Sequence, residues 1–185
     1  MVLTVSLVAA CSSGEDKTGP ASTAKPVVKP TAGSPPSGPQ MRYKDSPLTL
    51  GGRPQAGGIT CEHFWAALYG DSPHTVEASP SALDGTDLSV FACRSGDAEL
   101  GFSKPDARAI FQVTGAQDGR SCNEAMKSGK ASEIKDGIPL LKLKVGQQFC
   151  ITHPYNPEKG ELLRVRQVLP PEGKVTLSVT AWEGR

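Results

Sequence analysis

The C-terminal part of the chain contains three successive segments in which side-chain character alternates from one residue to the next. They are QFCITH at 148–153, ELLRVRQVL at 161–169 and KVTLSVTAW at 174–182, and turn-rich sequences separate them. Such alternation is typical of β-strands, because neighbouring side chains point to opposite faces of a sheet. Three strands in a row predict an antiparallel meander, and one face of such a sheet must be buried.

The alternation also predicts which side chains share a face. In the middle strand, one face carries Leu163, Val165, Gln167 and Leu169, and the other carries Leu162, Arg164, Arg166 and Val168. In the last strand, Val175, Leu177, Val179 and Ala181 share a face, with Trp182 on the opposite one. A register of this kind is strongly specified wherever one face is buried.

Further elements are predicted upstream. Strands are expected at 48–50, 88–93, 99–103 and 107–114. Cys61, Phe64, Trp65 and Leu68 have helical spacing, which predicts a helix over 61–69, capped by Thr60 and ended by Gly70. Its aromatic face is interpreted as core or as a lid.

A second helix is predicted over 122–127. Ser121 and Glu124 form an S-x-x-E capping box, and Ser128 and Gly129 form its C-terminal cap. The fold class is therefore mainly β, at the margin of α+β. We expect a small antiparallel sandwich or partly open barrel with two short helices and the C-terminal meander.

The N-terminus has the pattern of an export signal. Residues 1–10 form an apolar run that is too short to cross a bilayer and that lacks the positively charged start of a signal peptide. That lack leaves open a translation start upstream of Met1. The segment Leu7 to Cys11 resembles the lipobox of bacterial lipoproteins, which implies cleavage before Cys11 and lipidation of its sulfur.

A Pro-, Gly-, Ser- and Thr-rich segment follows the lipobox. Residues 11–44 are expected to form the lipidated cysteine and a disordered tether, because residues 12–40 offer almost no large apolar side chain for burial apart from Val27 and Val28. Residues 45–185 are expected to form a single β-rich domain. The resulting protein is held on the outer face of a cell membrane by its lipid.

The cysteine count agrees with export. Lipidation of Cys11 leaves an even set in an oxidising compartment, namely Cys61, Cys93, Cys122 and Cys150. The chain has no CxxC pair, and gaps of about thirty residues differ from zinc-site spacing. Two disulfides are predicted rather than a metal site, and the residues themselves leave three pairings open.

The charge balance and motifs exclude several functions. With 20 basic and 19 acidic residues, the chain has no net field that attracts nucleic acid. His63, His74 and His153 lack metal-site spacing, and Ser95 lies in a turn sequence rather than a nucleophile elbow. The loop carboxylates Asp84, Asp87, Asp97 and Asp106 are interpreted as solvated. No cofactor, metal or catalytic residue is predicted.

One candidate ligand surface is basic. Arg164 and Arg166 share a strand face, and the meander brings Lys142 and Lys144 into the same region of the predicted fold. The resulting stripe could meet an anionic envelope polymer, but a solvated outer face is the favoured interpretation.

The segments DLSVFAC, SCNEA, VGQQFCITH, GELLRVRQV and KVTLSVTAWE resemble a β-rich extracytoplasmic domain. This domain recurs in actinobacterial lipoproteins and at the outer ends of some membrane-bound serine/threonine kinases, a family of unassigned function. The resemblance implies the pairings Cys122–Cys150 and Cys61–Cys93. At 151–153 the chain has Ile-Thr-His in place of the family's Val-Arg-Thr, so a ligand contact by that arginine does not transfer.

Together these features predict a lipid-anchored envelope protein with a non-catalytic binding, sensing or scaffolding domain. Its partners are the membrane, an envelope polymer or another membrane protein. The alternative is an envelope-polymer hydrolase that uses His153 or His63 as its base. A hydrolase requires a pocket in which a histidine meets a serine, cysteine or carboxylate, whereas a binding module requires an exposed apolar or aromatic patch.

Overall fold

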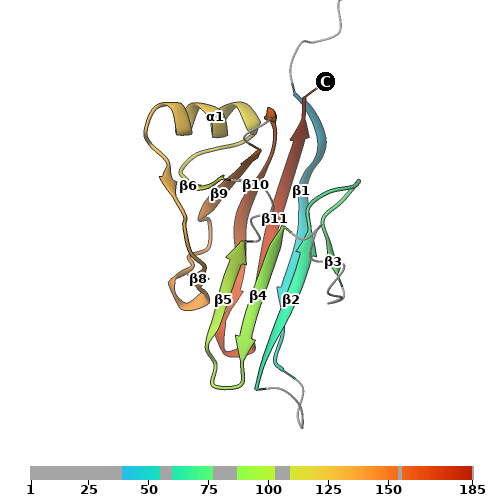
Figure 1. The fold of residues 1–185 in the computed structure, drawn as a ribbon, viewed down its shortest axis with the longest axis vertical. Coiled ribbons are helices and arrows are strands. Elements are labelled where there is room, and N and C mark those ends of the chain that lie inside the picture. Colours follow the sequence, from blue (N-terminus) through green and yellow to red (C-terminus); the bar gives the residue numbers. More distant parts are fainter. Residues whose placement is uncertain (1–38, 55–59, 77–86, 103–108, 154–155, 185) are drawn as a thin grey trace, which may run out of the picture. The chain divides into compact units, whose positions relative to one another are not determined.

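The computed structural model describes residues 39–54, 60–76, 87–102, 109–153 and 156–184. Cys11 and residues 11–38 of the expected tether lie outside these ranges. The described strands form two antiparallel sheets (Figure 1). The large sheet has the order β1 (Gln40–Gly51), β11 (Lys174–Glu183), β10 (Asn156–Leu169), β9 (Gln148–His153), β6 (Ala109–Val113) and β7 (Ser132–Glu133). The small sheet has the order β3 (His74–Val76), β2 (Cys61–Ala67), β4 (Leu88–Cys93), β5 (Ala98–Phe102) and β8 (Ile138–Pro139).

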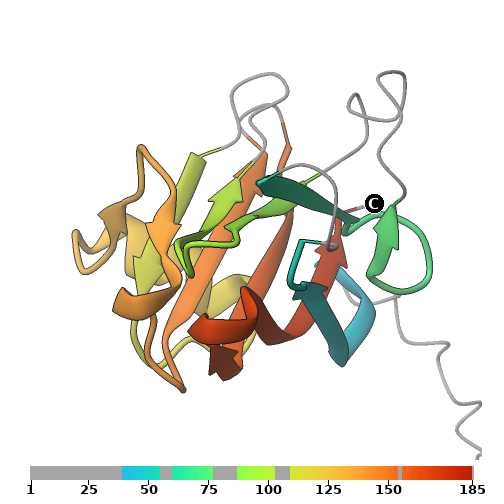
Figure 2. The ribbon, with the colours of Figure 1, turned by 90° about the horizontal axis from the view of Figure 1, so that it is seen from below.

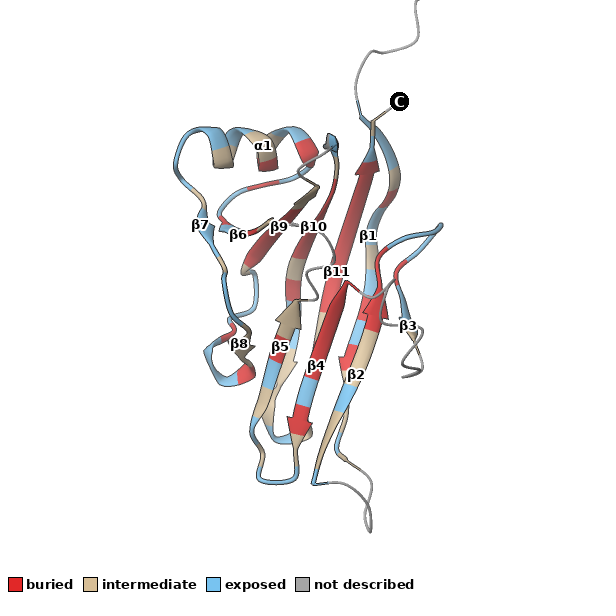
Figure 3. Ribbon diagram, viewed as in Figure 1, coloured by how far each residue is buried: buried red, intermediate tan, exposed pale blue. Residues whose placement is uncertain are grey.

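The mainly β class and the C-terminal meander are confirmed, because β9, β10 and β11 are consecutive neighbours in the large sheet. The two sheets pack face to face (Figure 2). Their shared core contains the inward residues of β11, which are Val175, Leu177, Val179 and Ala181, as the alternation predicts. The small sheet contributes Leu88, Val90, Ala92 and Leu100 to the same core. Figure 3 shows the buried residues concentrated along the central strands.

Strand β10 contains an irregularity that the sequence did not predict. Val165 pairs with Leu177 and Gln167 pairs with Thr176, so Arg166 is an extra residue in β10. Val168 then pairs with the core residue Val175 and packs against the core. The predicted faces are therefore wrong beyond Val165, because a bulge shifts the alternation by one residue.

The helix predicted over 61–69 is also wrong, because this segment forms strand β2. Its residues pair with β4 and β3, and Cys61 lies opposite Cys93. A strand sends neighbouring side chains to opposite faces. Phe64 packs against the core, whereas Trp65 lies on the open face.

The one α-helix of the described residues, α1 (Gly119–Lys127), begins earlier than predicted. Its N-cap is Asp118, whose carboxylate accepts from the backbone N–H of Ser121 at 2.9 Å. The Ser121 hydroxyl accepts in return from the Asp118 N–H, so Ser121 is the third helical residue and not the cap. The predicted C-cap is confirmed at Ser128, followed by Gly129 in the left-handed conformation. Two short 3₁₀ turns, η2 (Leu140–Lys142) and η3 (Pro170–Glu172), complete the described elements.

Helix α1 packs on the outer face of the large sheet. Cys122, Cys150, Leu162 and Trp182 form a second buried cluster there. A Cβ on Gly119 would lie 2.4 Å from the Trp182 indole, so only glycine permits this close approach.

The two disulfides are those that the family resemblance implied. Cys61–Cys93 joins neighbouring strands of the small sheet, and Cys122–Cys150 joins α1 to β9. The bonded residues are 32 and 28 positions apart. In the chain-entropy model, a bridge across a loop of this length contributes about 3–4 kcal/mol to stability.

The cap of α1 makes a testable prediction. Hydrogen bonds from Ser121 lower the pKa of the Asp118 carboxyl in the folded protein. The ionised carboxylate therefore stabilises the fold above its unfolded-state pKa, and this stabilisation is lost as the pH falls through its lower folded-state pKa. Asp118→Ala should lower the free energy of unfolding by about 1 kcal/mol near neutral pH. The control Asp118→Asn keeps a hydrogen-bond acceptor but has no charge. The difference in free energy of unfolding between this variant and the wild type should shrink below about pH 4, where the aspartate becomes protonated. Urea unfolding that shows no loss for Asp118→Ala would contradict the assigned cap.

Candidate functional site

The open face of the small sheet carries three neighbouring aromatic rings, His63 and Trp65 from β2 and Phe91 from β4. Antiparallel pairing places them together, since His63 lies opposite Phe91 and Trp65 lies opposite Ser89. We call these three side chains the aromatic face. Their alternate neighbours on β2 and β4 point into the core, so the sandwich fixes the backbone beneath the rings.

The rings of the aromatic face contact one another. The His63 and Trp65 rings are stacked with an angle of 9° and centroids 5.2 Å apart. The His63 and Phe91 centroids are 4.5 Å apart. His63 is exposed, Trp65 is half-buried and Phe91 is 38% exposed. The sheet therefore presents a continuous aromatic surface to solvent.

Hollows adjoin this surface on two sides of Trp65. One, of about 290 Å³, lies between Trp65 and the 134–137 segment, with Ser89 and Gly101 in its lining. The other, of about 350 Å³, is lined by Trp65, His63, Glu62, Thr75 and Val76, together with 49–51 of β1 and Phe64. A Cβ on Gly101 would lie 2.6 Å from the Ser89 hydroxyl, so a larger residue there would crowd the first hollow.

Polar groups lie at the border of the rings. Glu99 lies opposite Phe91 on β5, and Asp136 and Lys135 line the first hollow. Glu62 lines the second hollow from the other face of β2, since it lies opposite the core residue Ala92. The buried Ser89 hydroxyl lies in the lining beside Trp65. The surface thus combines flat aromatic area with hydrogen-bond acceptors at its border.

The predicted basic stripe is only partly brought together. Arg166 lies 3.5 Å from the Asp45 carboxylate and donates to the Ser178 hydroxyl at 3.3 Å. Arg164 lines a hollow on the outer face of the large sheet, beside Lys44. Lys142 in η2 and Lys144 before β9 are exposed and do not line that hollow. Lys44 is not among the residues predicted from the sequence, because the composition of residues 11–44 places it in the tether, whereas the structure places it in β1.

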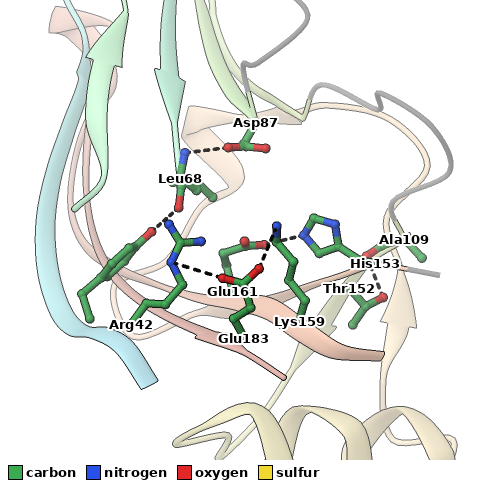
Figure 4. A network of polar contacts seen from close by, with 10 residues as sticks. Arg42, Leu68, Asp87, Ala109, Thr152, His153, Lys159, Glu161 and Glu183 are labelled. Carbon is green, nitrogen blue, oxygen red and sulfur yellow. Dashed lines mark hydrogen bonds and ion pairs between the residues drawn. The ribbon is translucent and has the colours of Figure 1, made fainter. Parts of the chain in front are cut away.

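His153 meets a carboxylate at the end of the large sheet. Its Nε2 atom lies 3.5 Å from Oε2 of Glu161, which is 3% exposed (Figure 4). Neither atom has a hydrogen-bond partner within the described chain. Burial, and next the nearby Glu161 charge, raises the pKa of Tyr43, whose hydroxyl donates to the Leu68 carbonyl. The His153–Glu161 pair joins β9 to β10 inside the sandwich and lines none of the hollows described above.

The remaining candidate residues have structural roles. Ser95 donates to the Asp97 carboxylate at 2.9 Å in the β4–β5 turn, which confirms the turn interpretation. Asp87 is buried and accepts from the Leu68 N–H at 2.6 Å, so its interpretation as a solvated carboxylate is wrong. Asp84 and Asp106 lie outside the described residues. His74 contacts the Ser72 carbonyl and the Tyr69 ring.

The described residues also bear on metals and membranes. Within these ranges, no group of three or more His, Cys, Asp or Glu side chains is placed to hold a metal ion. Cys61 and Cys150, which neighbour His63 and His153 in sequence, are both disulfide-bonded. Across the same part of the chain, no helix has the length and apolar character needed to cross a bilayer.

Comparison with protein-family models, with curated proteins and with solved structures finds no match for this chain. The resemblance to actinobacterial lipoprotein domains therefore has no support from these comparisons.

The two tryptophans give a direct test of the aromatic face. Trp182 is 3% exposed, whereas Trp65 is half-buried beside two hollows. Acrylamide should quench one of two emission components in the wild type, and Trp65→Phe should remove that component. If the fluorescence remaining in Trp65→Phe is quenched as readily as in the wild type, the described burial is incorrect.

Proposed function

We propose that this chain is a lipid-anchored, extracytoplasmic protein whose sandwich binds a neutral carbohydrate of the cell envelope without catalysing a reaction. The observation that carries the proposal is the aromatic face formed by His63, Trp65 and Phe91. Contiguous exposed apolar patches rimmed by polar residues often mark interaction or ligand-binding sites.

The chemistry around the rings favours a carbohydrate ligand. Aromatic faces carry partial negative charge and attract the C–H groups on one side of a sugar ring. The carboxylates of Glu99 and Asp136 are acceptors for sugar hydroxyls. These carboxylates also repel polyanions, so a neutral glycan is the favoured class.

The two hollows favour a ligand longer than one sugar. Trp65 lines both of them, so a chain that stacks on its indole has space on either side. A small surface of this kind gives weak binding to one segment, because association carries a large entropy penalty. A repeating polymer raises the apparent affinity through effective concentration.

Membrane attachment rests on the N-terminal sequence. The Leu7 to Cys11 motif and the following polar segment support a lipid anchor and a tether. The two disulfides agree with an oxidising compartment. A signal peptide and di- or triacylated Cys11 form part of the proposal, since one acyl chain binds membranes only marginally.

The alternative function is hydrolysis of an envelope polymer with His153 or His63 as base. The 3.5 Å approach of His153 to Glu161 is the observation in its favour. His63 instead stacks on Trp65 and contacts Phe91 with a tilted ring, an arrangement that suits ligand contact. Release of soluble fragments from purified envelope polymer, abolished by His153→Gln, would establish the alternative.

Substitution of Trp65 tests the binding surface. Trp65→Ala should weaken binding of the full chain to neutral envelope glycan by about tenfold, because it removes the indole of the aromatic face, which lines both hollows. The matched control is Tyr69→Ala, which removes a 50% exposed aromatic ring outside the aromatic face. Equal glycan retention by wild type and Trp65→Ala in affinity electrophoresis would refute the proposal.

Substitution of Cys11 tests the anchor separately. Cys11→Ser should move the protein from the membrane fraction to the soluble fraction, because serine cannot accept the thioether lipid. Fractionation followed by mass spectrometry of the N-terminal peptide checks both location and lipid mass. Unchanged membrane association in Cys11→Ser would contradict lipid anchoring and leave the glycan surface unaffected.

A further inference from the structure

A third hollow, with different chemistry, lies on the outer face of the large sheet. It has a volume of about 240 Å³ and is lined by Lys44, Asp45, Gln117, Leu162, Arg164, Ser178 and Thr180. We call it the basic hollow. The outer faces of the two sheets lie on opposite sides of the sandwich, so it is separate from the aromatic face and does not depend on the proposed function (Figure 2).

The floor of the basic hollow is polar and buried. Ser178 and Thr180 project from β11 on the face opposite its core residues, yet they are only 5% and 4% exposed. Arg164 lies opposite Ser178 in the register of β10 and β11. Its Nη2 atom also donates to the Ala116 carbonyl at 3.4 Å, which orients the guanidinium beside the hollow.

The rim is formed by an irregular part of β1. Asp45 has a φ of 51°, and the pairing of β1 with β11 shifts register between Tyr43 and Ser46. Its N–H donates to the Thr180 hydroxyl oxygen at 3.0 Å. Left-handed backbone in a residue other than glycine is uncommon, and such conformations cluster at functional sites.

The negative charge of the Asp45 carboxylate is balanced by a neighbouring guanidinium. It accepts from the Ser178 hydroxyl at 2.9 Å and lies 3.5 Å from the Arg166 guanidinium. Arg166 therefore balances the one acidic group of the lining. Lys44 and Arg164 remain as positive charges facing the same space.

We propose that the basic hollow binds a phosphate group. Arg164, Lys44 and the Thr180 hydroxyl offer donors from three different strands, β10, β1 and β11. The Thr180 oxygen already accepts from Asp45, so its own proton is directed to a further acceptor. Donors that converge from several directions suit the tetrahedral oxygens of phosphate better than a planar carboxylate.

Titration of the full chain with inorganic phosphate at low ionic strength, monitored by NMR chemical shifts and by calorimetry, tests the site. Wild type should show saturable binding with shifts at Lys44, Arg164 and Thr180. Arg164→Gln and Lys44→Gln should each weaken it by about tenfold. The matched controls Lys142→Gln and Lys144→Gln remove the same charge outside the hollow and should leave the affinity unchanged.

Asp45→Asn sharpens the test, because asparagine tolerates the left-handed backbone and still accepts from Ser178. Removing the negative charge should tighten phosphate binding. Glycerol phosphate and phosphatidylglycerol vesicles distinguish a free or polymeric phosphate from a lipid headgroup. Absent or non-saturable phosphate binding, stronger binding of acetate than phosphate, or equal losses in the Lys142 and Lys144 controls would each overturn the proposal. Lys44 is exposed, so its variant keeps the test valid if Arg164→Gln fails to fold.

Discussion

The structure depends on the burial of one face of β11 between the two sheets. Its inward residues Val175, Leu177, Val179 and Ala181 are all at most 1% exposed and contact the core of the small sheet. The neighbouring strands β1 and β10 take their register from this strand. Once the inward face is fixed, Ser178, Thr180 and Trp182 must lie on the outer face, where they form the basic hollow and the platform for α1.

The same constraint explains what could be predicted from the sequence. In β11 the alternation is uninterrupted, so its faces follow directly from a period of two. In β10 the extra residue Arg166 breaks that period, and no glycine or proline in ELLRVRQVL indicates the bulge. The start of α1 was missed for a related reason. Ser121 satisfies the capping-box pattern from either position, and only the fold shows that Asp118 is the cap.

The candidate site was missed because one segment fits two periods. Cys61, Phe64, Trp65 and Leu68 have helical spacing, but pairing with β4 and the bridge to Cys93 make the segment a strand. Helical geometry would place Phe64 and Trp65 on one face, whereas the strand packs Phe64 against the core and places the half-buried Trp65 on the opposite, open face. The sequence does contain an indication of a strand, because His63 and Trp65 stand at alternate positions on either side of Phe64 and would share one face of a strand. Lys44 was missed because tertiary pairing with β11 orders a segment that composition assigned to a tether.

The candidate binding surface exists only if β2 is a strand that places His63 and Trp65 on the open face of the small sheet. Nuclear Overhauser contacts between the backbones of β2 and β4 test this arrangement most directly. The structure predicts contacts between Phe64 and Val90 and between Glu62 and Ala92, which are cross-strand partners. Contacts three residues apart within the segment, such as Cys61 to Phe64, together with no contacts to β4, would show a helix and contradict the account.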